Sequence, residues 1–166
     1  ASLREDRSPE ILVQIDGQLP FWASILPFRL VQTPTIVELI NLTIQFCVSV
    51  ELRLKHAFAC PRPHELSSEI RPLIATPGHG AFPMGHAAQV EAVGLLLSML
   101  LREVGKTSRE FESGSDALCE RIAENRVVAG VHYPVDAVAG AYLGRMLGAF
   151  IIAASSGTRQ IGRAHV

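Results

Sequence analysis

The chain has 166 residues, of which 48% are apolar and 19% are charged. This composition predicts one folded domain over residues 1–166 with a substantial core, and it excludes a disordered chain. The formal net charge is -1, so the chain has no overall basic field for nucleic acid, and an anion site must come from a local cluster of cations.

Cysteine usage and the start of the chain narrow the class further. Cys47, Cys60 and Cys119 are odd in number and lack metal-type spacing, which predicts small apolar residues or free thiols and disfavours a zinc site. Residues 1–10 are charged and have no apolar h-region, so we expect a solvated lead-in and no signal peptide. The sequence leaves open that the chain is the C-terminal core of a longer protein.

Three apolar segments raise the question of a membrane protein: residues 35–50, 93–101 and 135–154. A membrane span needs about 20 predominantly apolar residues. The first segment contains Glu38 and Gln45, the second is too short, and the third contains Asp136 and Arg145. We therefore favour a soluble bundle and keep membrane association as the less favoured alternative. The apolar content is also compatible with a homo-oligomer interface.

Apolar residues spaced three and four apart predict an all-α fold, a compact bundle of four to five main helices with a long active-site loop. Pro34, with Thr33 as its cap, begins a helix that we expect to run to about Ala57 and to carry Lys55 near its end. Residues 60–83 are rich in Pro, Gly, Ser and His and predict the long loop.

The second half of the chain predicts three more helices. His86 opens an apolar helix that ends near Gly105. Ser115 suits the cap of the next helix, and Pro134 suits the first position of the last helix, which places Asp136 in its first turn.

Gly140, Gly144 and Gly148 recur every four residues in the last predicted helix. In a membrane, this spacing can mark a contact between two helices. In a soluble bundle it lets two helices approach closely, and this is the interpretation that we prefer.

Polar residues form three clusters that an anion with several oxygens would satisfy together. His132 and Asp136 lie four residues apart, and a carboxylate bonded to one ring nitrogen makes the other nitrogen a better nucleophile or ligand. Arg126 adds a fixed cation. Taken alone, each residue has an ordinary explanation. A His–Asp pair is often structural, and Lys55 could simply pair with Glu51 on the helix surface.

The combination is more specific than its parts. In order, the chain reads Lys55-x6-Arg62-Pro63, Pro83-x-Gly85-His86 and Arg126-x5-His132-x3-Asp136. This pattern resembles the three-part signature of the type 2 phosphatidic acid phosphatase and vanadium haloperoxidase superfamily, which reads K-x6-RP, PSGH and SR-x5-H-x3-D. The resemblance covers the catalytic core, about half of the chain, and it is specific for the superfamily rather than for one reaction.

The resemblance implies an anion site for phosphate or vanadate. Lys55, Arg62 and Arg126 would bind the non-bridging oxygens, with the arginines in bidentate geometry. The Gly85 N–H group would add a donor, and the dipole of a helix that starts at His86 would favour the anion.

The resemblance also implies the catalytic groups. His132 would be the nucleophile that attacks phosphorus, or the one protein ligand to vanadium. Asp136 would orient His132, and His86 would be the acid–base group at the apical oxygen. In the haloperoxidase reaction, Lys55 would polarise the bound peroxide.

Two residues depart from the family pattern. Met84 stands where the family has Ser, so the anion lacks a hydroxyl donor. A hydrogen bond to a charged group is worth roughly 1.5–3 kcal/mol, and we expect affinity or rate to fall by about ten- to a hundredfold. The Met84 thioether could also crowd the pocket. Asn125 replaces the Ser before Arg126, which we expect to be milder.

Three functions are compatible with this pattern. The first, and the one that we favour, is a vanadate-dependent haloperoxidase that oxidises halide with hydrogen peroxide, because residues 76–86 resemble the haloperoxidase form of the second motif. In bromoperoxidases a histidine falls at the place of His79, which could otherwise be a solvated loop residue. The second is a phosphatase that hydrolyses phosphomonoesters through a phosphohistidine and needs no cofactor. The third is a non-catalytic helical subunit with a decayed anion site, which Met84 supports.

Overall fold

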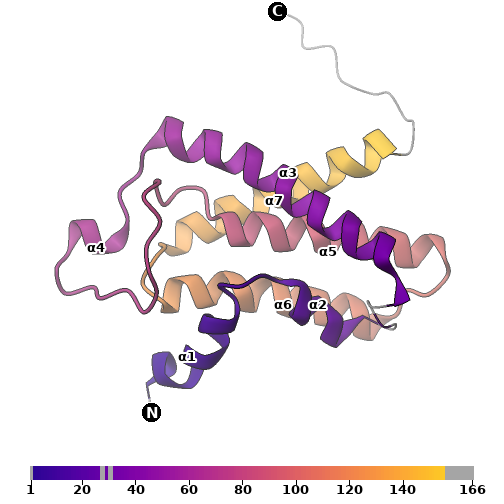
Figure 1. Cartoon of the computed structure of the whole chain (residues 1–166), viewed down its shortest axis with the longest axis horizontal. Coiled ribbons are helices and arrows are strands. Elements are labelled where there is room, and N and C mark those ends of the chain that lie inside the picture. The colour runs from indigo at the N-terminus through magenta and orange to yellow at the C-terminus, as the bar shows by residue number, and fades with distance from the viewer. Residues whose placement is uncertain (1, 27–28, 30–31, 156–166) are drawn as a thin grey trace, which may run out of the picture.

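Helix α5, Gly85–Glu103, lies at the centre of the computed structural model, which describes residues 2–26, 29 and 32–155 (Figure 1). Three long helices pack against it: α3 (Pro34–Phe58), α6 (Arg109–Val128) and α7 (Pro134–Ser155). Most side chains of α5 are buried, as expected for a helix covered on all sides. The described residues form helices and no strands, which confirms the all-α prediction.

The starts of α3 and α7 follow the sequence as predicted. Pro34 and Pro134 occupy the first positions of these helices, where the missing N–H group costs no hydrogen bond and the fixed φ suits the helix. Helix α3 ends at Phe58, where Ala59 adopts a left-handed φ of 46° and its N–H group donates to the Lys55 carbonyl. Lys55, in the last turn of α3, therefore lies at one end of the bundle.

The solvated lead-in predicted for residues 1–10 is wrong, because helix α1 spans Leu3–Val13. Its start is stabilised by a capping box, in which the Ser2 and Glu5 side chains each accept a hydrogen bond from the other's backbone N–H group. The Ile11 side chain of this helix is completely buried, so packing holds α1 in place in addition to the cap. A second short helix, α2 (Leu19–Ile25), follows it.

The cap predicted at Ser115 is also wrong. Helix α6 begins at Arg109, because the Ser108 side chain accepts a hydrogen bond of 3.1 Å from the Phe111 N–H group. Ser115 is buried in the middle of this helix. Both serines have the chemistry of a cap, and the sequence between them is helical because Phe111 packs into the core.

Close packing of α5 and α7 depends on the three glycines of α7. A Cβ atom at Gly140 would collide with the Met84 carbonyl oxygen, and one at Gly144 with the Ala88 carbonyl oxygen. At Gly148 the nearest atom, Ala92 Cα, would be 3.2 Å away. The predicted close approach of two helices is therefore confirmed, with α5 as the partner.

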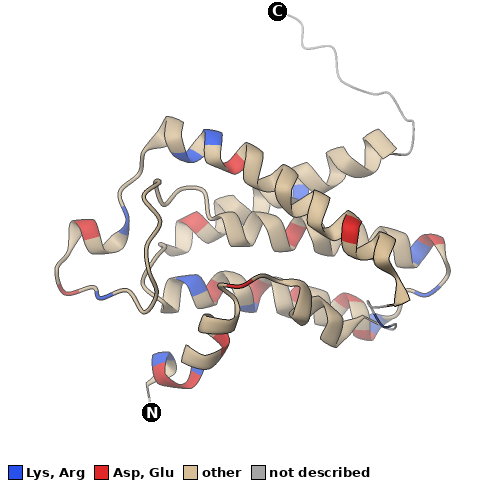
Figure 2. Ribbon diagram, viewed as in Figure 1, with Lys and Arg blue, Asp and Glu red and all other residues tan. Residues whose placement is uncertain are grey.

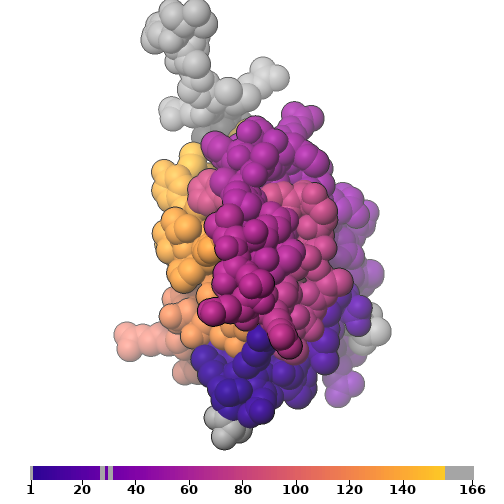
Figure 3. Space-filling model, turned by 90° about the vertical axis from the view of Figure 1, so that its left-hand side faces the viewer, coloured from indigo at the N-terminus to yellow at the C-terminus, as the bar shows by residue number. Residues whose placement is uncertain are grey.

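The segment between α3 and α5 wraps the end of the bundle where α3 ends and where α5 and α7 begin (Figures 1 and 3). Its one described helix is the short α4, Pro63–Leu66. Gly80 lies against Cys60 and the Lys55 carbonyl, where a Cβ atom would be only 3.0 Å from backbone atoms. The long loop predicted for residues 60–83 is thus present, and it is packed against the end of α3.

The outer faces of the bundle differ in polarity (Figure 2). Large apolar side chains on α7 face outward and are more than half exposed: Val138, Tyr142, Met146 and Phe150. Two segments, Pro34–Leu66 and Pro134–Ser155, are long and apolar enough to cross a membrane by length and composition. Helix α6 instead carries many charges along its length.

Candidate active site

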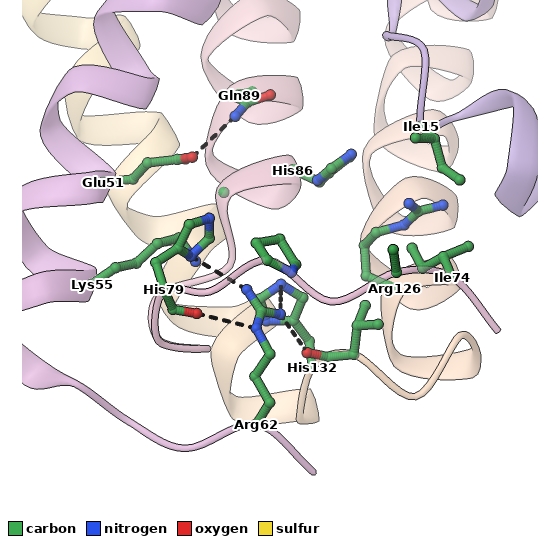
Figure 4. Close-up of a pocket in the computed structure, with 14 residues that line it drawn as sticks. Ile15, Glu51, Lys55, Arg62, Ile74, His79, His86, Gln89, Arg126 and His132 are labelled. Atoms are coloured by element: carbon green, nitrogen blue, oxygen red, sulfur yellow. Dashed lines mark hydrogen bonds between the residues drawn. The ribbon is translucent and has the colours of Figure 1, made fainter. Parts of the chain in front are cut away.

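A cavity of about 200 Å³ lies at the end of the bundle where α3 and α6 end and α5 begins. Its walls bring together side chains from distant parts of the sequence, among them Lys55, Arg62, His86, Arg126 and His132 (Figure 4). The three sequence clusters therefore meet in one place. The volume is several times the roughly 30 Å³ that one water molecule occupies in the liquid, so an anion with several oxygens fits.

His132 is held in one orientation at the start of α7. Its Nδ1 lies 3.2 Å from Asp136 Oδ2, and the same oxygen accepts a hydrogen bond of 2.9 Å from the Tyr133 N–H group. On the other side of the ring, Nε2 lies 3.5 Å from a guanidinium nitrogen of Arg62, which can only donate. The consistent tautomer has the proton on Nδ1 and a lone pair on Nε2. Burial lowers the pKa of His132, against the opposing effect of Asp136, so the neutral ring is favoured.

Lys55 is 1% exposed, and its side chain lines the cavity near the end of α3. It donates to the Ala81 carbonyl at 3.2 Å and to the Gly80 carbonyl at 3.4 Å. The spacing suggested a surface pair of Lys55 with Glu51, but both side chains are buried, and no ion pair within 4 Å joins them among the described residues. Lys55 is thus a buried cation held by carbonyl oxygens.

Arg62 is also 1% exposed and is fixed by several acceptors. It donates to the Val131 carbonyl at 2.8 Å and to the His79 carbonyl at 3.2 Å. The His79 ring nitrogen Nδ1 lies 3.3 Å from the same guanidinium. Burial is the main cause that lowers the pKa of His79, with the cations Lys55 and Arg62 adding to it. His79 is thus part of the site wall and contacts Arg62.

Arg126 reaches the cavity from the end of α6 and is held from behind by α1. One of its guanidinium nitrogens donates to Gln14 Oε1 at 2.8 Å and to the Ile11 carbonyl at 3.0 Å. Burial lowers the pKa of Arg126 to about 10, so it stays cationic at neutral pH. The Nε atom is buried without a hydrogen-bond partner. Arg126 therefore keeps a donor for a ligand.

Asn125, the second departure from the family pattern, has a role in this contact. Its amide nitrogen donates to Gln14 Oε1 at 3.2 Å and to Glu10 Oε1 at 2.8 Å. Glu10 also forms an ion pair of 2.8 Å with Arg121. Asn125 and Arg126 together bind α1 to the end of α6.

The start of α5 lines the cavity with Gly85 and His86. Its cap residue, Met84, makes no side-chain cap hydrogen bond, so the first N–H groups of the helix are free to bind an anion. Burial, followed by the charge of Arg126, lowers the pKa of His86 to about 4. Bound phosphate would oppose this effect, because a dianion stabilises the imidazolium.

Met84 is completely buried and is not among the residues that line the cavity. Its backbone contacts α7, where its N–H group donates to the Asp136 carbonyl at 3.0 Å. The structure gives no contact by which the thioether would crowd the anion. The expected loss of a hydroxyl donor at this position stays a prediction.

Sequence reasoning missed several residues of the site. Ile15 and Gln89 line the cavity, and Gln14 holds Arg126. Glu51 also lines it, although its spacing from Lys55 suggested only a surface pair. Burial of the polar side chains of Gln14 and Glu51 is the one signal, and it appears only once the helices are assembled.

The three cysteines form no disulfide in the described part of the chain. Cys47, Cys60 and Cys119 are free thiols. Among the described residues, no group of three or more His, Cys, Asp or Glu side chains could hold a metal ion. The cavity is instead built from cations and N–H groups.

Two solved structures have a similar fold. The transmembrane PAP2-type phosphatidylglycerolphosphate phosphatase from Bacillus subtilis has a TM-score of 0.62 and 16% identity, over 95% of this chain and 87% of that one. LpxE from Aquifex aeolicus has a TM-score of 0.60 and 21% identity, over 92% of this chain and 96% of that one. No curated protein matches the sequence significantly.

These findings contradict the preference for a soluble protein. The Bacillus subtilis structure is of a transmembrane protein, and two segments of this chain are apolar and long enough to span a membrane. In the last of these segments, the two charged residues that argued against a span both have partners. Asp136 is buried against His132, and Arg145 forms an ion pair of 2.9 Å with Glu91. The findings point to the membrane rather than to a soluble bundle.

The comparisons also favour the phosphatase alternative over the haloperoxidase, and they give no support to vanadate as a cofactor. The model of the PAP2 superfamily matches residues 35–159, which include every residue of the three motifs. The chain therefore belongs to the PAP2 superfamily, whose helical fold it has.

Proposed function

We propose that the chain is a membrane phosphatase that hydrolyses the phosphate monoester of a lipid through a phosphohistidine at His132. The observation that carries this proposal is the His132 ring, which has Nδ1 on Asp136 and Nε2 directed toward Arg62 in a cavity lined by cations. A neutral imidazole beside buried cations attacks phosphorus well, because the cations neutralise the charge of the phosphate.

The proposed first step transfers the phosphoryl group to the protein. His132 Nε2 attacks phosphorus, and the bond from phosphorus to the ester oxygen breaks. Lys55, Arg62 and Arg126 bind the non-bridging oxygens during this step, and the N–H groups at the start of α5 add donors. His86 gives its proton to the leaving oxygen, which departs as an alcohol.

The second step releases phosphate. The neutral His86 takes a proton from a water molecule, whose oxygen attacks phosphorus as the bond to His132 Nε2 breaks. Inorganic phosphate leaves, and His86 is again protonated for the next cycle. Asp136 keeps the proton of His132 on Nδ1 throughout, so it is a positioning residue.

A lipid substrate is supported by the apolar surface around this end of the bundle. Phe58 at the end of α3, Leu66 at the end of α4 and Val135 at the start of α7 are all more than half exposed. These residues lie close in sequence to Lys55, Arg62 and His132. An exposed apolar rim beside a polar cavity suits a substrate with a phosphate headgroup and apolar chains.

The test is hydrolysis by the full chain, purified in detergent, of a short-chain phosphatidic acid and of p-nitrophenyl phosphate. We expect release of inorganic phosphate, inhibition by orthovanadate and a preference for the lipid. His132→Ala should abolish release, while the exposed His56→Ala serves as the matched control. Absence of hydrolysis for both substrates would contradict the proposal.

The same preparation tests the other two functions. Vanadate-loaded protein that brominates an organic acceptor with bromide and peroxide, and does not hydrolyse the esters, would favour the haloperoxidase. Protein that binds neither phosphate nor vanadate would favour a non-catalytic subunit.

A further inference from the structure

Glu51 is a carboxylate in the wall of the cavity that the proposed reaction does not use. It lies on α3, is 5% exposed, and lines the cavity together with Lys55 and Gly85 (Figure 4). Its carboxyl group packs directly on Gly85, where a Cβ atom would collide with it. Glu51 is thus beside the N–H groups at the start of α5 that would hold an anion.

The two oxygens of Glu51 have different surroundings. Oε1 accepts a hydrogen bond of 3.2 Å from the Gln89 amide nitrogen. The Gln89 oxygen in turn accepts one of 3.3 Å from Gln18, which fixes the amide with its nitrogen toward Glu51. Oε2 is buried and has no hydrogen-bond partner. A buried polar atom without a partner is costly unless a ligand completes it.

The protonation state of Glu51 decides whether its Oε2 atom repels an anion or donates a hydrogen bond to it. An ionised carboxylate next to phosphate would repel it, whereas a neutral carboxyl group has an O–H donor. Lys55, one turn along α3, donates to the Gly80 and Ala81 carbonyls and forms no ion pair with Glu51. The other titratable and charged groups that line the cavity are Arg62, His79, His86, Arg126 and His132, with Asp136 bonded to His132.

We propose that Glu51 is a further anion-binding residue, whose neutral carboxyl group donates a hydrogen bond from Oε2 to a non-bridging oxygen of the bound phosphate. This inference rests on the proposed function and names one more group of the same site. It would supply a hydroxyl donor to the anion in a site where Met84 has none. The Gln18–Gln89 pair then orients the donor.

The test is direct binding of inorganic phosphate and orthovanadate to the full chain in detergent, measured by calorimetry, so that turnover is not needed. Glu51→Ala removes the donor and should weaken both anions by about tenfold or more. Glu51→Gln keeps a neutral donor of similar size and should weaken them by about threefold at most. The exposed Glu38→Ala on the same helix is the matched control and should leave binding unchanged.

Each other outcome overturns the inference in a distinct way. If Glu51→Ala and Glu51→Gln both bind the anions more tightly, the carboxylate is ionised and repels phosphate. If both variants bind as the wild type does but unfold at a lower temperature, Glu51 only fills the structure. If the wild type itself binds neither anion, the proposed function fails together with this inference.

Discussion

Helices α6 and α7 both pack against α5, yet they have opposite outer surfaces. Helix α7 exposes Val138, Tyr142 and Met146, and its glycines let it lie directly on α5. Helix α6 exposes charged side chains and is bound to the N-terminal helix through Asn125 and Arg126. One helix therefore suits lipid, and the other suits water and a polar partner helix.

The candidate site takes residues from both of these helices, in addition to those from α3, α5 and the segment between them. His132 and Asp136 lie at the start of α7, while Arg126 lies at the end of α6. In the proposed reaction the first pair provides the chemistry, and the arginine provides charge for binding. Substitutions on the two helices should therefore lower activity to different extents, through kcat on the α7 side and through binding on the α6 side.

The largest effect is expected from the α7 side, at the nucleophile. His132→Ala should lower kcat for phosphate-ester hydrolysis by on the order of 10³-fold or more, as loss of a nucleophile does in other enzymes. Single-turnover experiments on the wild type should also trap a phosphorylated protein that is absent from the variant. A variant that keeps a tenth of the activity would mean that another group attacks phosphorus.

The glycines of the two helices offer a matched pair for stability. Gly144→Leu places a Cβ atom against the Ala88 carbonyl of α5, and we expect a loss of about 3 kcal/mol in the free energy of unfolding. Gly114→Ala on α6 meets its nearest neighbour, Ile25, at 3.8 Å and should gain about 0.5–1 kcal/mol from helix propensity. Thermal unfolding in one detergent measures both. Equal effects would show that α7 does not need its close contact.

Stability should depend on pH through His86, which lies between the two halves. Its pKa is lowered to about 4 in the folded protein, against about 6.5 in the unfolded chain. Between these values the unfolded chain binds more protons, so the free energy of unfolding rises with pH. The contribution, about 3 kcal/mol at most, is complete above about pH 6.5 and is lost as the pH falls toward 4.

Unfolding midpoints measured across this range should therefore fall on acidification, and His86→Asn should flatten the fall. Saturating phosphate should oppose it, because a bound dianion favours the imidazolium. The proposed acid–base role of His86 also depends on this last point. A phosphate-independent slope would argue that the anion does not contact His86.

The outer surfaces are compared by placing the same new charge on each helix. Tyr142→Asp on α7 should cost about 2 kcal/mol if this face contacts lipid, seen as reduced recovery of folded protein from membranes. Ala117→Asp, an exposed position on α6, should change stability by about 0.5 kcal/mol at most. Equal recovery of both variants would mean that α7 does not face lipid.

Local sequence signals predicted much of the fold. Pro34 and Pro134 start their helices as expected, because proline at a helix start is decided within a few residues. The cap of α6 could not be chosen correctly, since Ser108 and Ser115 both suit a cap and the burial of Phe111 decides between them. The soluble expectation failed in part because Asp136 and Arg145 were counted against a membrane span before their partners were known.

The sequence predicted the site residues that belong to the spaced motifs. It could not predict the residues that reach the site only when the helices pack together. Lys55, Arg62, His86 and His132 meet in one cavity as their spacing indicated. Glu51 and Gln14 were missed because no spacing in the chain relates them to an anion. Their importance follows from the packing of α1 and α3 around the other helices.

The smallest effect is expected behind Arg126, where α1 holds the α6 half of the site. Gln14→Ala removes the side chain that accepts from Arg126 at 2.8 Å and from Asn125 at 3.2 Å, while the catalytic pair on α7 is untouched. We expect kcat/KM to fall by about tenfold, mostly through KM, because one hydrogen bond to a charged group is lost. Leu12→Ala, half-exposed on the same helix, is the control for damage to α1. If Gln14→Ala lowered kcat as strongly as His132→Ala does, α1 would have to position the nucleophile as well, and the division between a binding half and a chemical half would be wrong.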